Sequence, residues 1–183
     1  MQAETTRRKG FKGRKLVDPA KRREWHEAAK KEMAARREAS LDALTTESGW
    51  AAFVEAGLRF SYSWRNCALV ADTCPGATLL MTAHRWKGEG IYIREGQHSV
   101  WISKPEPGKG FRTLQLFDVS MTQAPADFME AQAGWTETDE LAFGEAVAEA
   151  LAAVPAPIDG SREQVVEACK RLDGHRKGEA WTL

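Results

Sequence analysis

Residues 58–80, LRFSYSWRNCALVADTCPGATLL, contain the point at which the sequence changes from a helical to a strand pattern. Ser63 is a good helix-capping residue, and the apolar side chains after it predict a helix over 64–73. A Pro-Gly pair at 75–76 ends that helix, because proline cannot continue it and glycine favours a turn. The short segments that follow are rich in strand formers and predict a small antiparallel sheet over 77–119. The expected fold class is therefore α+β, a small sheet packed with several helices.

Further helices are predicted from capping residues and from apolar side chains at helical spacing. The first begins at Asp18-Pro19, the second ends at Gly57, and the last opens with a Ser161–Gln164 capping box and ends at Gly174. Within the sheet, Glu95-Gly96 predicts a tight hairpin turn and 104–110 a loop between strands. The helices are expected at 19–39, 45–57, 136–154 and after Ser161, and the strands at 77–86, 90–94, 98–103 and 111–119.

The composition is typical of a soluble globular protein, with 43% apolar and 28% charged residues in 183. No apolar run approaches the 18 residues or so of a membrane span, so we expect no membrane partner. The charged start of the chain lacks the apolar core of a signal peptide. Three cysteines, an odd number in helix-like contexts, favour reduced thiols and a cytoplasmic location.

The net charge is zero, but the charges are unevenly distributed. Residues 1–40 carry 13 Lys and Arg against 6 Asp and Glu, whereas residues 118–183 carry 5 against 13. Such asymmetry indicates a polyanionic partner, or only a solvated surface. We expect a basic arm and helix over 1–40, a central domain over 41–125, and an acidic extension of two helices over 126–183. The cations of the arm are Arg7, Arg8, Lys9, Lys12, Arg14 and Lys15.

The motifs of enzyme and metal chemistry are not found. His26-Glu27 resembles the start of a zinc-protease helix, but position 30 is Lys where the second histidine ligand would stand. Cys67 and Cys74 are seven residues apart with no histidine nearby, which is not a metal-ligand spacing. No glycine-rich loop joins a strand to a helix, so a nucleotide-type phosphate site is unsupported. We therefore expect no enzyme activity, no metal and no cofactor.

Nucleic-acid binding is better supported by the central region. Single strands bind to a cationic track flanked by flat side chains on which bases stack. Aromatic rings and cations alternate here, and residues 84–87 place His, Arg, Trp and Lys in succession. The residues predicted to contact DNA are Arg59, Tyr62, Trp64, Arg65, Arg85, Trp86, Lys87, Arg94, Trp101 and Arg112.

Structural interpretations of the same side chains stay open. Trp64 could belong to the core, and Trp101 suits either a core or a stacking surface, since it alternates with Val100 and Ile102. Arg59 and Arg65 could instead form salt bridges with the acidic C-terminal helices.

The order of motifs over 41–125 resembles the N-terminal, single-stranded-DNA-binding domain of ArdC-type antirestriction proteins. An aromatic-Ser-x-x-Asn segment opens a helix at Tyr62, Ser63 and Asn66, and a strand leads to Trp86. A hairpin pattern follows at 90–97, and the family's Phe-Asp-Val-Ser-x-Thr ending occurs at 117–122. The resemblance implies a DNA-binding role for this region and adds Asn66 to the predicted contacts.

Two departures from the family pattern matter. The hairpin carries Glu95-Gly96-Gln97 in place of Lys-Gly-Glu, which removes a positive charge. The zinc signature of longer members does not occur in these 183 residues, so the resemblance implies DNA binding and not proteolysis.

The function expected is binding of single-stranded DNA with low sequence specificity, in an antirestriction or DNA-protection protein of a plasmid, bacteriophage or other mobile element. Binding of double-stranded DNA is left open. One alternative is an inhibitor that acts on a host protein through the acidic C-terminal helices. Another is an accessory DNA-binding protein of plasmid replication or transfer.

Overall fold

The computed structural model describes residues 18–108, 110–128 and 137–178, and the arm cations predicted to contact DNA lie outside these ranges. The contacts divide the chain into two compact units, Met1–Glu32 and Met33–Leu183. Helix α1 (Pro19–Ala43) contributes to both. It begins as predicted, because the Asp18 carboxylate accepts a hydrogen bond from the Ala20 amide at 2.9 Å. The second unit is described in the rest of this section.

Two helices form the centre of the second unit. Helix α2 (Glu47–Arg59) is capped by Thr46, whose hydroxyl accepts from the Gly49 amide at 3.1 Å, and α3 (Trp64–Thr73) follows after a short extended segment. Gly57 was predicted to end α2, but it is buried inside the last turn. A helical glycine costs only about 1 kcal/mol, which the packing of that turn can offset.

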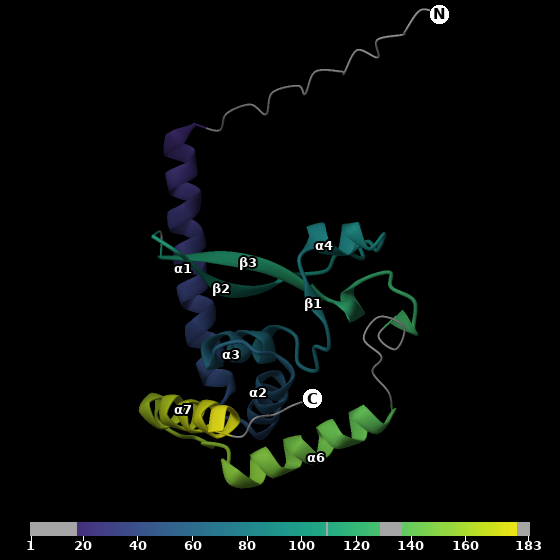
Figure 1. Ribbon diagram of the computed structural model, residues 1–183. Coiled ribbons are helices and arrows are strands. Elements are labelled where there is room, and N and C mark those ends of the chain that lie inside the picture. Colours follow the sequence, from purple (N-terminus) through teal and green to yellow (C-terminus); the bar gives the residue numbers. More distant parts are fainter. Residues whose placement is uncertain (1–17, 109, 129–136, 179–183) are drawn as a thin grey trace, which may run out of the picture. The chain divides into compact units, whose positions relative to one another are not determined.

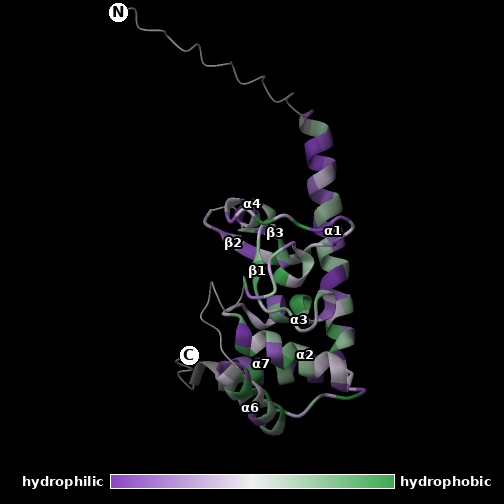
Figure 2. Cartoon of the chain, turned by 90° about the vertical axis from the view of Figure 1, so that its right-hand side faces the viewer, coloured by the Kyte–Doolittle hydropathy of each residue, from purple (hydrophilic) through white to green (hydrophobic). Residues whose placement is uncertain are grey.

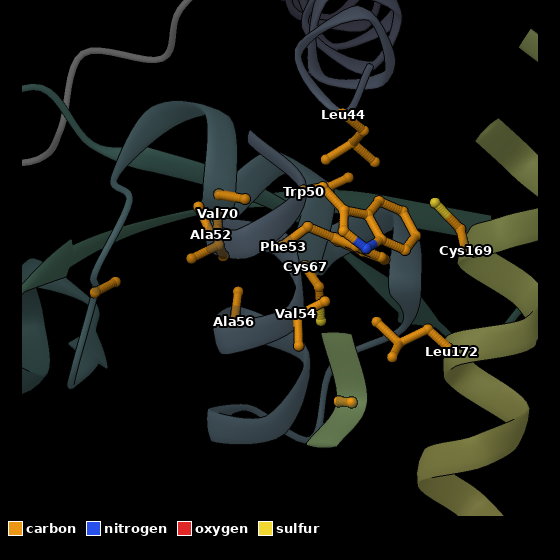
Figure 3. Packing of buried hydrophobic residues seen from close by; sticks show 14 of the residues in the cluster. Leu44, Trp50, Ala52, Phe53, Val54, Ala56, Cys67, Val70, Cys169 and Leu172 are labelled. Atoms are coloured by element: carbon orange, nitrogen blue, oxygen red, sulfur yellow. The ribbon is translucent and has the colours of Figure 1, made fainter. Parts of the chain in front are cut away.

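The C-terminal helices share the core of the central region. Helices α6 (Glu137–Ala153) and α7 (Arg162–Gly178) place Val154, Val165, Cys169 and Leu172 beside the buried side chains of α2 and α3. Figure 3 shows Trp50 and Phe53 of α2 near Cys169 and Leu172 of α7. The Trp50 indole also donates to the Val154 carbonyl at 3.0 Å.

The capping box that starts α7 forms in both directions. The Ser161 amide donates to Gln164 Oε1 at 2.6 Å, and the Gln164 amide donates to Ser161 Oγ at 3.4 Å. Gly174 does not end the helix, which continues to Gly178.

The sheet is small and antiparallel, which confirms the α+β fold class. Strands β1 (Leu80–Met81), β2 (Val100–Glu106) and β3 (Gly110–Asp118) take the order β1-β3-β2, and a 3-10 turn, η1 (Val119–Met121), follows β3. In Figure 1, α3 lies on one side of this sheet and α4 on the other. Glycines with positive φ at Gly108 and Gly110 close the hairpin between β2 and β3.

The region 77–99 differs from the sequence prediction. Helix α4 (Ala83–Gly88) replaces the C-terminal half of the expected strand over 77–86, with Thr82 as its cap. Residues 90–94 make only an isolated bridge, from Ile93 to Thr122. The turn at Glu95-Gly96 forms, with the Gln97 amide donating to the Arg94 carbonyl, but it does not join paired strands.

Two hydrophobic clusters lie on opposite faces of the sheet. Leu116 belongs to the main cluster with α2 and α3, whereas the next residue, Phe117, packs on a smaller cluster of Met81, Trp86, Ile91 and Phe128. This is the alternation expected of a strand covered on both faces. Figure 2 shows hydrophobic residues gathered in α3 and β1, while hydrophilic residues recur along α1. Within the described ranges, no helix combines the length and apolar character that crossing a membrane requires.

Candidate nucleic-acid interface

A groove of about 490 Å³ lies between the segment before α3 and the β2–β3 hairpin. One wall is formed by Ser61, Tyr62 and Ser63, with Asn66 of the first turn of α3. The floor and the other wall come from the hairpin and are listed here: Ile102, Ser103, Lys104, Pro105, Phe111, Leu114 and Leu116. The volume falls within the range of sites that hold small organic molecules, about 300–1,000 Å³.

Strand register determines which hairpin side chains meet at the groove. Ile102 pairs with Leu114 and Lys104 with Arg112, and directly paired residues lie on the same face of the sheet. The apolar pair forms the floor, and the cationic pair lies farther along the same face, toward the turn. Arg112 is 4.0 Å from Glu106 in an exposed ion pair, which contributes little to stability.

Two aromatic rings border the groove. Tyr62 is half-buried and stacks on Phe60, with ring centroids 5.4 Å apart and an interplanar angle of 13°. Burial, helped by the nearby Cys67, raises the pKa of Tyr62, so its phenol stays neutral at physiological pH. Phe111 is 73% exposed at the hairpin end of the groove. One ring is therefore held in place by a neighbour and the other is open to solvent.

The N-terminus of α3 opens beside the groove. Ser63 occupies the capping position, but its side chain makes no capping hydrogen bond. The first amides of a helix carry partial positive charge and attract anions.

Asn66 has a structural role in the groove wall. Its Nδ2 donates to the Ser103 carbonyl at 2.9 Å, and its Oδ1 accepts from the Ser103 amide at 3.0 Å. These are backbone groups of β2, which lies at the edge of the sheet. The Asn66 side chain thus makes the pair of hydrogen bonds that a neighbouring strand would make to this edge, and it attaches α3 to the hairpin. The predicted contact to DNA is replaced by this attachment.

Trp86 cannot stack on a base, which corrects the prediction. Its side chain is 0% exposed, and its Nε1 donates to the Phe117 carbonyl at 2.8 Å. The ring packs against Phe128 at a centroid distance of 5.7 Å. The cations around Trp86 in the sequence lie on the solvent side of α4, while the indole points inward.

Arg59 and Trp101 are also engaged in packing. The Arg59 guanidinium lies 4.0 Å from the Phe143 ring and 3.5 Å from the Glu140 carboxylate, which confirms the alternative of a salt bridge to the C-terminal helices. Trp101 lies on the face of β2 opposite Ile102, half-buried, with the Arg36 guanidinium 4.6 Å from its ring. Neither side chain borders the groove.

Arg85, Lys87 and Arg94 are exposed, but they do not join the groove. They belong to α4 and the turn after it, and α4 is attached to the face of the sheet that carries Phe117. The groove is lined from the other face, by Leu114 and Leu116. The single trough expected from the sequence is therefore divided between two faces of the sheet.

Trp64 and Arg65 lie on the far side of the α3 first turn from the groove. Trp64 is half-buried against the main core, and the Arg65 guanidinium lies 4.4 Å from its ring. For Arg65, this ring contact takes the place of the predicted ion pair with a C-terminal helix.

Sequence reasoning did not select Phe111 and Lys104 as site residues. Lys104 follows from the hairpin register, because it lies on the same face of β2 as Ile102. Phe111 pairs with Pro105 on the other face, so its place at the groove could not be derived from the alternation of the strand. The expected loop proved to be a tight turn, and it brings the two residues to the groove.

Among the described residues, no three His, Cys, Asp or Glu side chains gather closely enough to hold a metal ion. Comparisons with protein-family models, curated proteins and solved structures give no match for this chain.

Proposed function

We propose that this chain binds single-stranded DNA with little base preference, with the strand lying in the groove between 61–63 and the β2–β3 hairpin. The observation that carries the proposal is that Tyr62, Phe111 and Lys104 border one groove. Aromatic faces stack on any base, and a neighbouring ammonium attracts the phosphates. The exposed ring of Phe111 is available to a base, and the ring of Tyr62, which is stacked on Phe60, borders the same groove.

Further cations support the same ligand. Arg112 pairs across the hairpin with Lys104, and the α3 N-terminus adds partial positive charge to the opposite wall. The basic arm in the sequence would add a non-specific attraction that weakens as salt is raised. The resemblance to ArdC-type domains agrees with this ligand, and it suggests that the protein protects the DNA of a mobile element from host restriction.

Fluorescence anisotropy with labelled oligonucleotides over a salt series tests the proposal. Phe111→Ala should weaken binding about 5- to 150-fold, because a stacked base is worth about 1–3 kcal/mol. Lys104→Gln should reduce the slope of log affinity against log salt by about 0.7, the loss of one phosphate contact on a single strand. Tyr92→Ala is the matched control, since Tyr92 is 58% exposed and lies outside the groove.

Two results would contradict the proposal. Single strands that bind no tighter than about 100 μM at low salt would refute it, because electrostatic binding is strongest there. A larger loss with Tyr92→Ala than with Phe111→Ala would place the strand on the α4 side of the sheet.

A duplex competitor should displace the strand poorly, because paired bases cannot stack on the groove rings.

A further inference from the structure

A second hollow, of about 110 Å³, lies behind the first turn of α3. Arg37 of α1, Arg65 of α3 and Arg162 of α7 all line it, and we call it the arginine hollow. Trp64 and Ala68 form its inner wall. All these residues belong to the second unit.

The hollow carries an excess of positive charge. Arg162 donates to Glu38 Oε1 at 2.7 Å and makes a second contact with the other oxygen of the same carboxylate, so these two charges balance. This pairing lowers the pKa of Glu38, which is ionised at neutral pH. Arg37 and Arg65 add two further positive charges to the lining, while the carboxylates of Asp42 and Glu163 act on Arg162 from outside it.

The two other guanidinium groups are held in position by neutral partners. Arg37 Nη2 donates to Ser103 Oγ at 2.6 Å, and the Arg65 guanidinium lies 4.4 Å from the centre of the Trp64 ring. A guanidinium has five N–H donors, and neither contact uses more than a part of them. The arrangement suits a multivalent oxyanion, which accepts several of these donors at once.

Size and charge narrow the class of ligand. One water molecule needs about 10–15 Å³ of cavity volume, so a hollow of about 110 Å³ has room for a tetrahedral oxyanion. A phosphate monoester carries about −1.5 to −2 charge at pH 7, which several guanidinium groups can bind together. A phosphate inside a DNA strand carries only one negative charge, and its two ester links would have to pass through the same small space.

The hollow and the groove lie on the two sides of one structural connection. Asn66 binds the backbone of Ser103, and Arg37 binds the hydroxyl of the same serine. Ser63 and Asn66 border the groove, whereas Trp64 and Arg65 border the hollow. The first turn of α3 therefore separates the groove from the three arginines.

We propose that the arginine hollow binds the terminal phosphate of a DNA strand whose neighbouring nucleotides lie in the groove. The location of the strand rests on the proposed function, but the affinity of the hollow for a phosphate monoester does not. The protein would then distinguish phosphorylated strand ends from hydroxyl ends without reading any base.

The test compares oligonucleotides of one sequence that carry a 5′-phosphate, a 3′-phosphate or no terminal phosphate, with the full chain and calorimetric titration. One phosphorylated end should bind about tenfold tighter or more than the unphosphorylated strand, from one or two added charge-assisted hydrogen bonds. Arg65→Gln should abolish this preference and Arg65→Lys should restore part of it. The matched control is Arg171→Gln, an exposed arginine of α7 that does not line the hollow.

A titration with inorganic phosphate separates this inference from the proposed function. If no oligonucleotide binds but inorganic phosphate binds in an Arg65-dependent way, the hollow is supported as a phosphate site. The same result refutes the proposal that the groove binds DNA. If strands bind equally with and without terminal phosphates, the inference about the hollow is overturned, whereas the proposal that the groove binds DNA is not. A preference that Arg171→Gln removes as fully as Arg65→Gln would also overturn it.

Discussion

At the scale of single residues, burial holds several ionisable side chains in their neutral forms. Desolvation, with a contribution from Asp118, raises the pKa of Cys74 to about 11. Desolvation, with a contribution from Cys67, raises the pKa of Cys169 to about 12. In an unfolded chain a thiol has its ordinary pKa of about 8.5. The unfolded state therefore loses these protons at lower pH than the folded state does.

The stability of the protein should consequently fall at alkaline pH. The contribution of the thiols is fully present below about pH 8.5 and is lost progressively as the pH rises toward 11, because only the unfolded thiols ionise there. Urea unfolding from pH 7 to 10.5 measures this, with Cys74→Ala as the comparison, since titrations common to both proteins cancel. The wild type should lose more stability than the variant. Parallel pH profiles would show that the Cys74 thiol has no such effect.

The indole of Trp86 should matter for stability and not for DNA. Trp86→Phe leaves the Phe117 carbonyl without its buried donor, which we expect to cost about 1–3 kcal/mol in the free energy of unfolding. DNA affinity of the folded variant, measured by anisotropy well below its melting temperature, should equal that of the wild type. A weakened affinity for DNA with an unchanged free energy of unfolding would indicate that Trp86 contacts DNA after all.

At the scale of elements, the contact between α3 and β2 determines the shape of the groove. Asn66→Ala removes two hydrogen bonds to an edge strand and should destabilise the domain by about 1–3 kcal/mol. Hydrogen exchange at the Ser103 amide should lose protection in this variant, and the exposed Gln97→Ala should leave it unchanged. Retained protection at Ser103 would mean that water or another group replaces the asparagine.

The longer helices could be predicted from the sequence because their caps are local. Asp18, Thr46 and the Ser161–Gln164 box each accept hydrogen bonds from amides a few residues away. The start of each helix can therefore be predicted from a short stretch of sequence. Helix α4 could not be found in this way, since it has only six residues and β-forming neighbours. Its one buried ring, Trp86, owes its position to the distant Phe117 and Phe128.

The candidate site was predicted less well than the fold. Sequence reasoning selected aromatic and cationic side chains, but it could not tell which face of the sheet each one occupies. Tyr62 does border the groove, whereas Arg94 follows α4, which packs on the opposite face of the sheet. Trp101 lies elsewhere because it alternates with Ile102 along β2.

At the scale of the whole molecule, the acidic C-terminal helices are part of the core of the second unit. The side chains of Val154, Cys169 and Leu172 lie among those of α2 and α3. We therefore expect a fragment of residues 1–125 to lose its cooperative thermal transition in circular dichroism, because it exposes Trp50 and Phe53. A fragment with a sharp transition would show that the central region is an independent domain. The hypothesis of an inhibitor acting through these helices is better tested by neutralising exposed acids, as in Glu145→Gln with Glu149→Gln.

The most direct test of the proposal that the groove binds DNA is photo-cross-linking of a single-stranded oligonucleotide that contains 4-thiothymidine, with the attached peptides identified by mass spectrometry. The groove predicts cross-links at Tyr62 and Phe111, which are lost when an excess of unlabelled strand is added. Cross-links concentrated at Tyr92 and the residues of α4, with none at Tyr62 or Phe111, would contradict it.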